Sequence, residues 1–457
     1  MKIFLKHIIL FFVLLNIITA CHTRDNQQQV KLRGKIVNPK TDDVILSRDF
    51  LLLRSDTLKL FGENQVKGTV NTPVEGLYVF YVFPEFQTLY LKPGDSLAFH
   101  LNVDEFDESL SFSGSLGFEN NLLMELFLVN EKESDYFFHH KFDFSPALFF
   151  KKIDSFDRIK NQLINDYADD FRHTTSKYQD IVKLLNQSMT MNIKEVYARK
   201  RKDVKLPDNY FSYCKILQKK LPDPNVIYLY AFANSFLARK VSGQNLDKKH
   251  LYKKIANVIN NNFYDRAFKN NVLVNYCNRY IRNQHITKAD TVIFTFYQYM
   301  DNKSYKDYCK RLIHKNRRLK QGKKFPSLIL TDQNKQPVLL DTILKNNKVL
   351  IGFWDLKQRK NFISNLKKYK KYKSLYPEIK FLIINDNPQQ FDEWVMQIPA
   401  EKNLMFLQLK ANDSSKIILP HHLSQVYLVD NKVIKQSMLN IYRQDFEKRI
   451  TGFYNEK

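Results

Sequence analysis

VLIGFWDLKQRKNFISNLKKYKKYKSLY, residues 349–376, is the most informative stretch of this chain. It begins with a short and nearly continuous apolar run, residues 349–353, which is typical of a strand buried on both faces of a sheet. Asp355 stands where a helix N-cap would, and the apolar residues after it recur at helical spacing. These residues are Phe362, Leu366, Tyr369 and Tyr376. The stretch therefore predicts a buried strand, a short loop and an amphipathic helix.

The Phe-Trp pair at residues 353–354 begins a pattern that resembles the F-W-x-x-W-C-x-x-C motif of the TlpA/ResA-like thiol-disulfide reductases, which are membrane-anchored and have a thioredoxin fold. Aligned without a gap, the second Trp of the motif falls on Lys357, and the two cysteines fall on Gln358 and Asn361. An amide side chain forms no thiolate and opens no disulfide. The resemblance implies an α/β thioredoxin-like domain over residues 321–457 that lacks the CxxC chemistry.

The loop that faces the cysteine pair in that family also differs here. The family carries a cis-proline before the fourth strand, within P-T-T-F-L-I-D, and the matching stretch is SQVYLVD, residues 424–430. Ser424 stands at the proline position. A cis bond before a residue other than proline costs about 2.5–4 kcal/mol, so we expect a trans peptide and a loop of altered shape. Two of the three signature elements of the reductase site are thus replaced.

The N-terminus is similar to a bacterial lipoprotein signal. Lys2 and Lys6 precede an apolar core, residues 8–18, which is too short to span a membrane, and small residues lead to Cys21. The resemblance implies a signal peptide over residues 1–20, cleavage before Cys21 and acylation of that cysteine; an ordinary cleaved signal followed by a chance cysteine is the alternative. Acyl chains would hold the protein on a membrane of the cell envelope. The surface lipoproteins that the resemblance brings in carry acidic residues soon after this cysteine. Because only Asp25 is acidic here, the resemblance implies the outer membrane, facing the periplasm.

Residues 21–29 are polar and aperiodic, and we expect a flexible tether there. Residues 30–115 alternate between apolar and polar side chains in short runs separated by turn signals such as Pro93-Gly94-Asp95, which predicts an all-β sandwich or barrel. This part resembles the N-terminal β-domain of unknown function found on Bacteroidetes thioredoxin-like lipoproteins. The matching positions are Asp56-Thr57, Gly76-Leu77-Tyr78, Pro93-Gly94-Asp95-Ser96, Phe112-Ser113-Gly114 and Asn120.

Residues 116–320 carry apolar side chains at spacings of three and four, which predicts a helical middle domain. Beyond residue 320 the pattern predicts a hairpin, then the strand, loop and helix described above, and further strands at residues 379–385, 404–409, 425–429 and 433–436. A short helix is expected at residues 391–398 and a closing helix at residues 444–452. The strand at 349–353 and the strand at 379–385 should be parallel, because a helix joins them.

The formal charge is +25, and residues 357–373 contain eight Lys or Arg and no acidic residue. A biased coding composition can also produce such a charge, since Lys, Asn, Ile, Phe and Tyr are all enriched. The lipoprotein signal places the protein outside the cytoplasm, so we expect no nucleic acid partner. The basic helix is then either a solvated face or a surface for an anionic ligand around Lys367 to Lys373.

Cysteine and histidine patterns predict no metal or other cofactor. Cys214, Cys277 and Cys309 have no partner at CxxC spacing, so they are either small buried residues or two of them pair and leave one over. His139-His140 and His421-His422 have neither an HExxH motif nor a carboxylate cluster. We keep His422 as a candidate ligand contact because it lies near Ser424.

Two hypotheses of function follow. The first is a lipid-anchored envelope protein whose redox-inactive thioredoxin-like domain holds a peptide or protein partner; its candidate binding residues are Trp354, Lys357, Gln358, Asn361, Ser424 and His422. We assign no catalytic residue, and lean against an enzyme, because the CxxC and the cis-proline are both missing. The second is a divergent envelope enzyme of the thiol-disulfide oxidoreductase family with unrecognised chemistry, and capture of an anionic ligand is a further alternative.

Overall fold

The computed structural model describes residues 28–83, 85–284, 286–354, 359–385, 403–409 and 425–456, without the side chains of residues 354 and 359–364. The chain forms two compact units. The first contains residues up to 245 together with 257–272, and the second contains residues 246–256 together with 273–457. Among the described helices, none combines the length and the apolar composition needed to cross a membrane.

The first unit begins with two four-stranded sheets, ordered β4-β1-β7-β8 and β3-β2-β5-β6. The strands are β1 (Gln29–Val37), β2 (Asp43–Ser47), β3 (Ser55–Lys59), β4 (Gln65–Asn71), β5 (Gly76–Val82), β6 (Glu85–Leu91), β7 (Ser96–Asn102) and β8 (Ser111–Ser113). A short η1 (Val103–Glu105) and α2 (Phe106–Ser109) join β7 to β8. Phe80 of one sheet meets Phe99 of the other edge to face, with the ring centroids 5.0 Å apart. The expected strands are therefore present and enclose an aromatic core.

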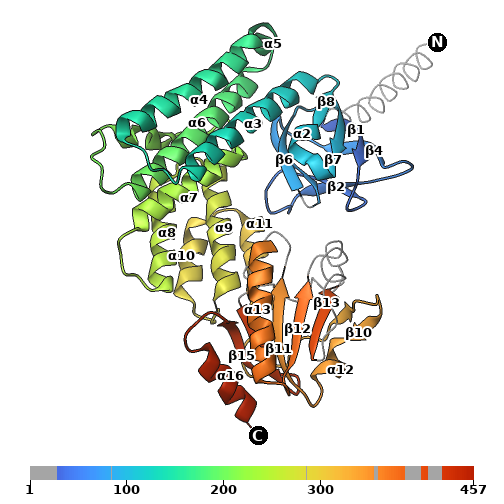
Figure 1. The fold of residues 1–457 in the computed structure, drawn as a ribbon. Helices are drawn as coiled ribbons and strands as arrows, with labels where there is room; N and C mark the ends of the chain where they lie inside the picture. The colour runs from blue at the N-terminus through green and yellow to red at the C-terminus, as the bar shows by residue number, and fades with distance from the viewer. Residues whose placement is uncertain are drawn as a thin grey trace, which may run out of the picture. The chain divides into compact units, whose positions relative to one another are not determined.

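Helices complete the first unit (Figure 1). They are α3 (Gly117–His139), α4 (Pro146–Asp166), α5 (Ala168–Arg172), α6 (Ser176–Lys200), the 3₁₀ segment η2 (Tyr210–Gln218) and α7 (Ile227–Val241). Ser145 and Thr175 cap α4 and α6, since each side chain accepts a hydrogen bond from a backbone N–H three residues ahead. Phe149 stacks on Tyr197 at a centroid distance of 3.8 Å, so α4 and α6 share an aromatic core.

Two further helices, α8 (Lys248–Asn262) and α9 (Arg266–Asn283), contribute residues to both units. The second unit also contains α10 (Thr291–Tyr299) and α11 (Lys303–Arg318), capped by the side chains of Asp290 and Asn302. The buried amide of Asn316 on α11 donates to the carbonyls of Ile281 and Gln284 at the end of α9. This amide satisfies carbonyls that the end of a helix leaves without an intrahelical partner.

The rest of the second unit is a seven-stranded sheet ordered β10-β9-β13-β12-β11-β14-β15. Its strands are β9 (Ile329–Thr331), β10 (Pro337–Leu339), β11 (Lys348–Trp354), β12 (Lys380–Asn385), β13 (Leu404–Leu409), β14 (Gln425–Asp430) and β15 (Val433–Asn440), and its helices are α12 (Leu340–Leu344), α13 (Arg359–Leu375) and α16 (Phe446–Asn455). β11, β12 and β13 are mutually parallel, while β9, β10, β14 and β15 run antiparallel to their neighbours. The parallel pair expected on either side of the basic helix is confirmed.

This order and these directions are those of a thioredoxin-like fold: a strand, a crossover helix, a parallel strand, then an antiparallel hairpin and a closing helix. Tyrosines of α13 and aromatic and aliphatic residues of α16 pack in one apolar cluster with the sheet. The helix expected at residues 391–398 lies outside the described residues. The closing helix is present, beginning at Phe446.

Candidate functional site

Most residues of the site predicted from the motif lie outside the described part of the chain. Trp354 is the last residue of β11, opposite Asn385, and Asn361 lies in the first turn of α13, but neither side chain is described. Lys357, Gln358, His422 and Ser424 lie outside the described residues, as does Cys21. The structure thus places the strand and the helix that would carry the site, and the contacts of its candidate residues stay predictions.

The sheet next to this position is packed with aromatic side chains. A Cβ at Gly352 would overlap the hydroxyl of Tyr369. Because glycine has no side chain at this position of β11, the helix α13 can approach the sheet. Tyr427 of β14 is buried and contacts the rings of Phe325 and Phe353, with centroids 6.0 and 6.1 Å away. Burial raises the pKa of both Tyr369 and Tyr427 well above the ordinary range. Both phenols are therefore neutral core residues.

The three cysteines of the described chain lie in the helices. Cys277 of α9 and Cys309 of α11 are free and fully buried, as small buried residues would be. A hydrogen bond with Cys309, together with burial, raises the pKa of Cys277 well above its ordinary value. Cys214 is free and partly buried. Residues 321–457 contain no cysteine in the sequence, so no thiol is present in the thioredoxin-like part of the chain.

Among the described residues, no group of three or more His, Cys, Asp or Glu side chains is placed to hold a metal ion. His139 and His140 end helix α3, and a ring nitrogen of His140 lies 2.7 Å from the Tyr136 carbonyl. His421 and His422 lie outside the described residues.

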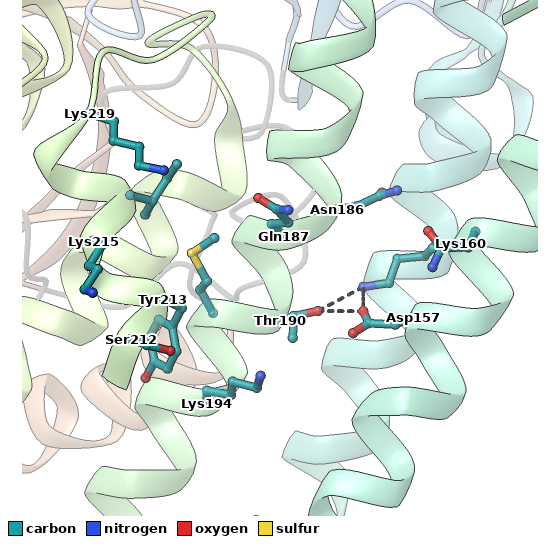
Figure 2. A pocket seen from close by; sticks show the side chains of 13 residues that line it. Asp157, Lys160, Asn186, Gln187, Thr190, Lys194, Ser212, Tyr213, Lys215 and Lys219 are labelled. Carbon is teal, nitrogen blue, oxygen red and sulfur yellow. Dashed lines mark hydrogen bonds and ion pairs between the residues drawn. The ribbon is translucent and has the colours of Figure 1, made fainter. Parts of the chain in front are cut away.

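The structure also shows a pocket that we did not predict from the sequence, in the helical part of the first unit (Figure 2). Its volume is about 570 Å³, which lies in the range of small-molecule sites. Helices α4 and α6 and the η2 segment supply its walls. The lining residues are Asp157, Lys160 and Asn161 from α4, Asn186, Gln187, Thr190, Met191 and Lys194 from α6, and Ser212, Tyr213, Lys215, Ile216 and Lys219 from η2 and its end.

One wall of this pocket contains a buried ion pair. The ammonium of Lys160 is 2.7 Å from a carboxylate oxygen of Glu133, and both side chains are at most 1% exposed. Lys160 also donates to Thr190, and Asp157 lies 3.4 Å from the same ammonium. Burial raises the pKa of Glu133, and the neighbouring Lys160 opposes that shift. Amide Nδ2 of Asn130 and Oε1 of Glu133 have no hydrogen-bond partner among the described residues.

The opposite wall is held by a second buried carboxylate, Glu195 of α6. Arg239 of α7 binds it with two hydrogen bonds, of 2.5 and 2.8 Å, in the forked geometry that makes such pairs strong. Tyr213, which lines the pocket, donates to Glu195 at 3.2 Å, and the thiol of Cys214 donates to it at 3.3 Å. Burial, followed by the charge of Glu195, raises the pKa of the Cys214 thiol to about 12. These contacts fix the η2 segment against α6 and so shape the pocket.

One signal for the pocket was present in the sequence. Phe149, Ile153 and Lys160 are spaced by four and seven residues, which puts a lysine on the buried stripe of a helix. Lysine is almost never fully buried unless it is paired, so this position marks a polar site in the core. The η2 residues carry no comparable periodic signal, because they form a 3₁₀ segment and not an α-helix.

No protein-family model matches the chain, and no curated protein matches it. Solved structures that it resembles include the thioredoxin domain of a thiol-disulfide oxidoreductase from Bacteroides vulgatus, with 20% identity, 30% of this chain and 99% of that chain covered, and a TM-score of 0.24. A thiol:disulfide interchange protein from Bacteroides sp. gives 19% identity, 30% and 92% coverage, and a TM-score of 0.24. A thioredoxin-like protein from Bacteroides caccae gives 12% identity, 57% and 93% coverage, and a TM-score of 0.32. These likenesses concern parts of the chain, and the thioredoxin-like fold of the C-terminal sheet rests on the strand order and directions given above.

Proposed function

We propose that this protein binds a peptide or protein partner through a thioredoxin-like domain that performs no thiol chemistry. The observation that carries the proposal is a thioredoxin-like arrangement of strands and helices over a stretch, residues 321–457, that contains no cysteine. Thiol-disulfide exchange requires a thiolate to attack a disulfide sulfur, and this stretch provides none. The thiols of Cys277 and Cys309 are fully buried, so neither is a substitute nucleophile.

A peptide suits such a domain because an extended chain can add to an open sheet edge. Strand β15 stands at one end of the sheet, and its first residues are covered by hydrogen bonds between residues 322–325 and the backbone of Lys432 and Ile434. Beyond them, Gln436, Leu439 and Asn440 pair with strand β14. The candidate contacts Trp354, Lys357, Gln358, Asn361, Ser424 and His422 belong to the same proposal.

The test of the redox part is an insulin reduction assay on the chain that starts at Cys21. We expect no turnover above the background of the chemical reductant. The matched variant replaces both Gln358 and Asn361 by Cys, and we expect it to form an internal disulfide, which mass spectrometry detects after alkylation. Catalytic insulin reduction by the unmodified protein would refute a redox-inactive domain. A double variant in which both thiols stay free would refute the alignment of these two positions with the CxxC.

The proposal includes a lipid anchor on Cys21 and a location on the outer membrane, facing the periplasm. Its support is the charged, apolar and small-residue order of the first twenty-one residues. In a bacterial envelope preparation we expect the full chain in the membrane fraction and the Cys21→Ser variant in the soluble fraction. Resistance of the protein to protease in intact cells would support the periplasmic face, and digestion would place it on the cell surface.

Anionic capture by the basic helix is the second candidate, and one observation favours it. Lys367, Lys370 and Lys371 are exposed on α13. Part of this charge is already engaged, since Lys371 lies 3.8 Å from Glu447 and Lys368 lies over the ring of Tyr442. Binding to heparin that weakens steeply between low and physiological salt would support this role, because exposed charges are screened over about 10 Å at 0.1 M salt.

A further inference from the structure

We propose that the pocket between α4, α6 and η2 binds a small organic anion that carries a carboxylate or a phosphate together with hydroxyl groups. The inference does not depend on the function proposed for the thioredoxin-like domain, because every lining residue lies in the first unit. The proposal rests on the charges that line the pocket and on its neutral hydrogen-bonding groups.

The lining has more positive than negative charge. Lys160, Lys194, Lys215 and Lys219 contribute four ammonium groups, whereas Asp157 is the acidic residue among the lining residues. The charge of Lys160 is balanced behind the wall by Glu133. None of the ion pairs found among the described residues includes any of the other three lysines. Lys194 lies over the ring of Tyr213, 5.9 Å from its centroid, and its charge also acts on Glu133. A bound anion would therefore neutralise chiefly the charges of Lys215 and Lys219.

The lysines reach the pocket from different elements, so their charges act on a common space. Figure 2 shows Lys194 on the same helix as Gln187 and Thr190, with Lys215 and Lys219 on the segment across from it. Lys194 is partly buried, and Lys215 and Lys219 are exposed. Ammonium groups arranged around a concave surface attract an anion more strongly than the same groups on a flat, fully solvated face, because the protein walls keep part of the water away.

The neutral groups point to a ligand with hydroxyls. Amides of Asn161, Asn186 and Gln187 and the hydroxyl of Ser212 line the pocket. Gln187 and Ser212 are exposed, so their polar groups are accessible to a ligand. An amide oxygen accepts a hydrogen bond, which a carboxylate or phosphate cannot donate, so these side chains favour a ligand that also carries hydroxyl or amine donors.

The volume of the pocket limits the size of the ligand. A volume of about 570 Å³ admits a molecule of the size of one or two sugar units and excludes a folded protein partner. The apolar part of the lining, which includes Met191, Ile216 and the ring of Tyr213, is as large as the polar part and suits the carbon skeleton of such a molecule. We therefore assign the pocket to acidic or phosphorylated sugars and similar hydroxylated acids.

The experiment is isothermal titration of the chain that starts at Cys21, with the cysteine replaced by Ser to remove acylation. The probes are galacturonic acid, its dimer, glucose 6-phosphate, inorganic phosphate and, as the neutral control, glucose. We expect binding of at least one of the organic anions and none of glucose. Tighter binding of galacturonic acid than of glucose 6-phosphate would indicate a carboxylate ligand, and the reverse order would indicate a phosphate ligand.

Variants locate the binding. We expect Lys194→Met and Lys219→Met each to weaken the binding about tenfold, since each removes one charge-assisted hydrogen bond. Lys220→Met is the matched control, because Lys220 is exposed beside Lys219 but does not line the pocket; its affinity should be unchanged. All three positions are at least partly exposed, so the fold should tolerate them. No heat of binding with any organic anion at 10 mM, or equal affinity in all three variants, would overturn the assignment.

Discussion

The buried pair of Lys160 and Glu133 gives the sharpest prediction about the stability of the first unit. Both side chains are at most 1% exposed, and their charged atoms are 2.7 Å apart. Replacing Lys160 by Met keeps the length of the side chain but leaves the Glu133 carboxylate buried without its cation. Removal of one partner of a buried ion pair costs about 3–5 kcal/mol, so we expect Lys160→Met to lower the free energy of unfolding by that amount at pH 8.

The stability lost by the Lys160→Met variant should be smaller at low pH than at high pH. Burial already raises the pKa of Glu133, and Lys160 is the first of the causes that oppose this shift, so loss of Lys160 raises the pKa further. A carboxylate with a raised pKa in the folded state binds more protons folded than unfolded, and its contribution to stability is lost as the pH rises. The variant should therefore recover stability when the pH falls from 8 to 5, by at most about 1.4 kcal/mol for each pH unit that lies between the unfolded and the folded pKa.

Urea unfolding followed by far-UV circular dichroism, at pH 8 and pH 5, measures both effects. The double variant Glu133→Leu/Lys160→Met removes both charges, and we expect its stability within about 1 kcal/mol of the unmodified protein, with little pH dependence added by this site. Lys183→Met, on an exposed position of α6, is the control for loss of a lysine and should change stability by less than about 0.5 kcal/mol. A loss below about 1 kcal/mol in the single variant, or an equal loss at both pH values, would refute the reasoning, because it would mean that water reaches Glu133.

Three further perturbations test other parts of the structure. Gly352→Ala should lower the stability of the second unit by about 1–3 kcal/mol, because the new methyl group overlaps the Tyr369 ring, and hydrogen exchange of β11 amides reports the change. Alkylation of Cys214 by iodoacetamide at pH 8 should be about a thousandfold slower than that of an exposed cysteine, since a pKa of about 12 leaves little thiolate, and Glu195→Gln should accelerate it because it removes the neighbouring negative charge. Cys277 should resist the same reagent until urea unfolds the protein, because its thiol is fully buried, and mass spectrometry of the peptides identifies the alkylated residue in each case.

The strand and helix around residues 349–376 could be predicted because their signals are local. The apolar run predicted a strand at residues 349–353, and β11 is Lys348–Trp354. The spacing of the tyrosines predicted the buried face of α13, and Tyr369 and Tyr376 are indeed buried. The last strand was predicted too short, since β15 continues to Asn440. Register shifts between β14 and β15 interrupt the regular pairing there, which leaves no simple alternation in the sequence to follow.

The pocket could not be predicted because its contacts depend on tertiary packing. Glu133 and Lys160 are 27 positions apart and lie on different helices, α3 and α4. The spacing along α4 shows that Lys160 faces the core, but nothing local shows which acid it meets. Likewise, Glu195 accepts a hydrogen bond from Arg239, which lies 44 positions away on α7. The predicted binding residues near β11 depend on loops outside the described chain, so their arrangement stays a prediction.

The sheet of the second unit packs without any cysteine in residues 321–457, because its described core is built from other residues. Tyr369, Tyr372 and Tyr376 anchor the second half of α13 in one cluster with Ile450 and Phe453 of α16. Each buried aromatic side chain of this kind contributes several kcal/mol, whereas a functional cysteine pair at the start of the helix contributes reactivity. If, as we propose, the domain binds a partner without thiol chemistry, the positions at which it departs from the reductase motif are Gln358, Asn361 and Ser424.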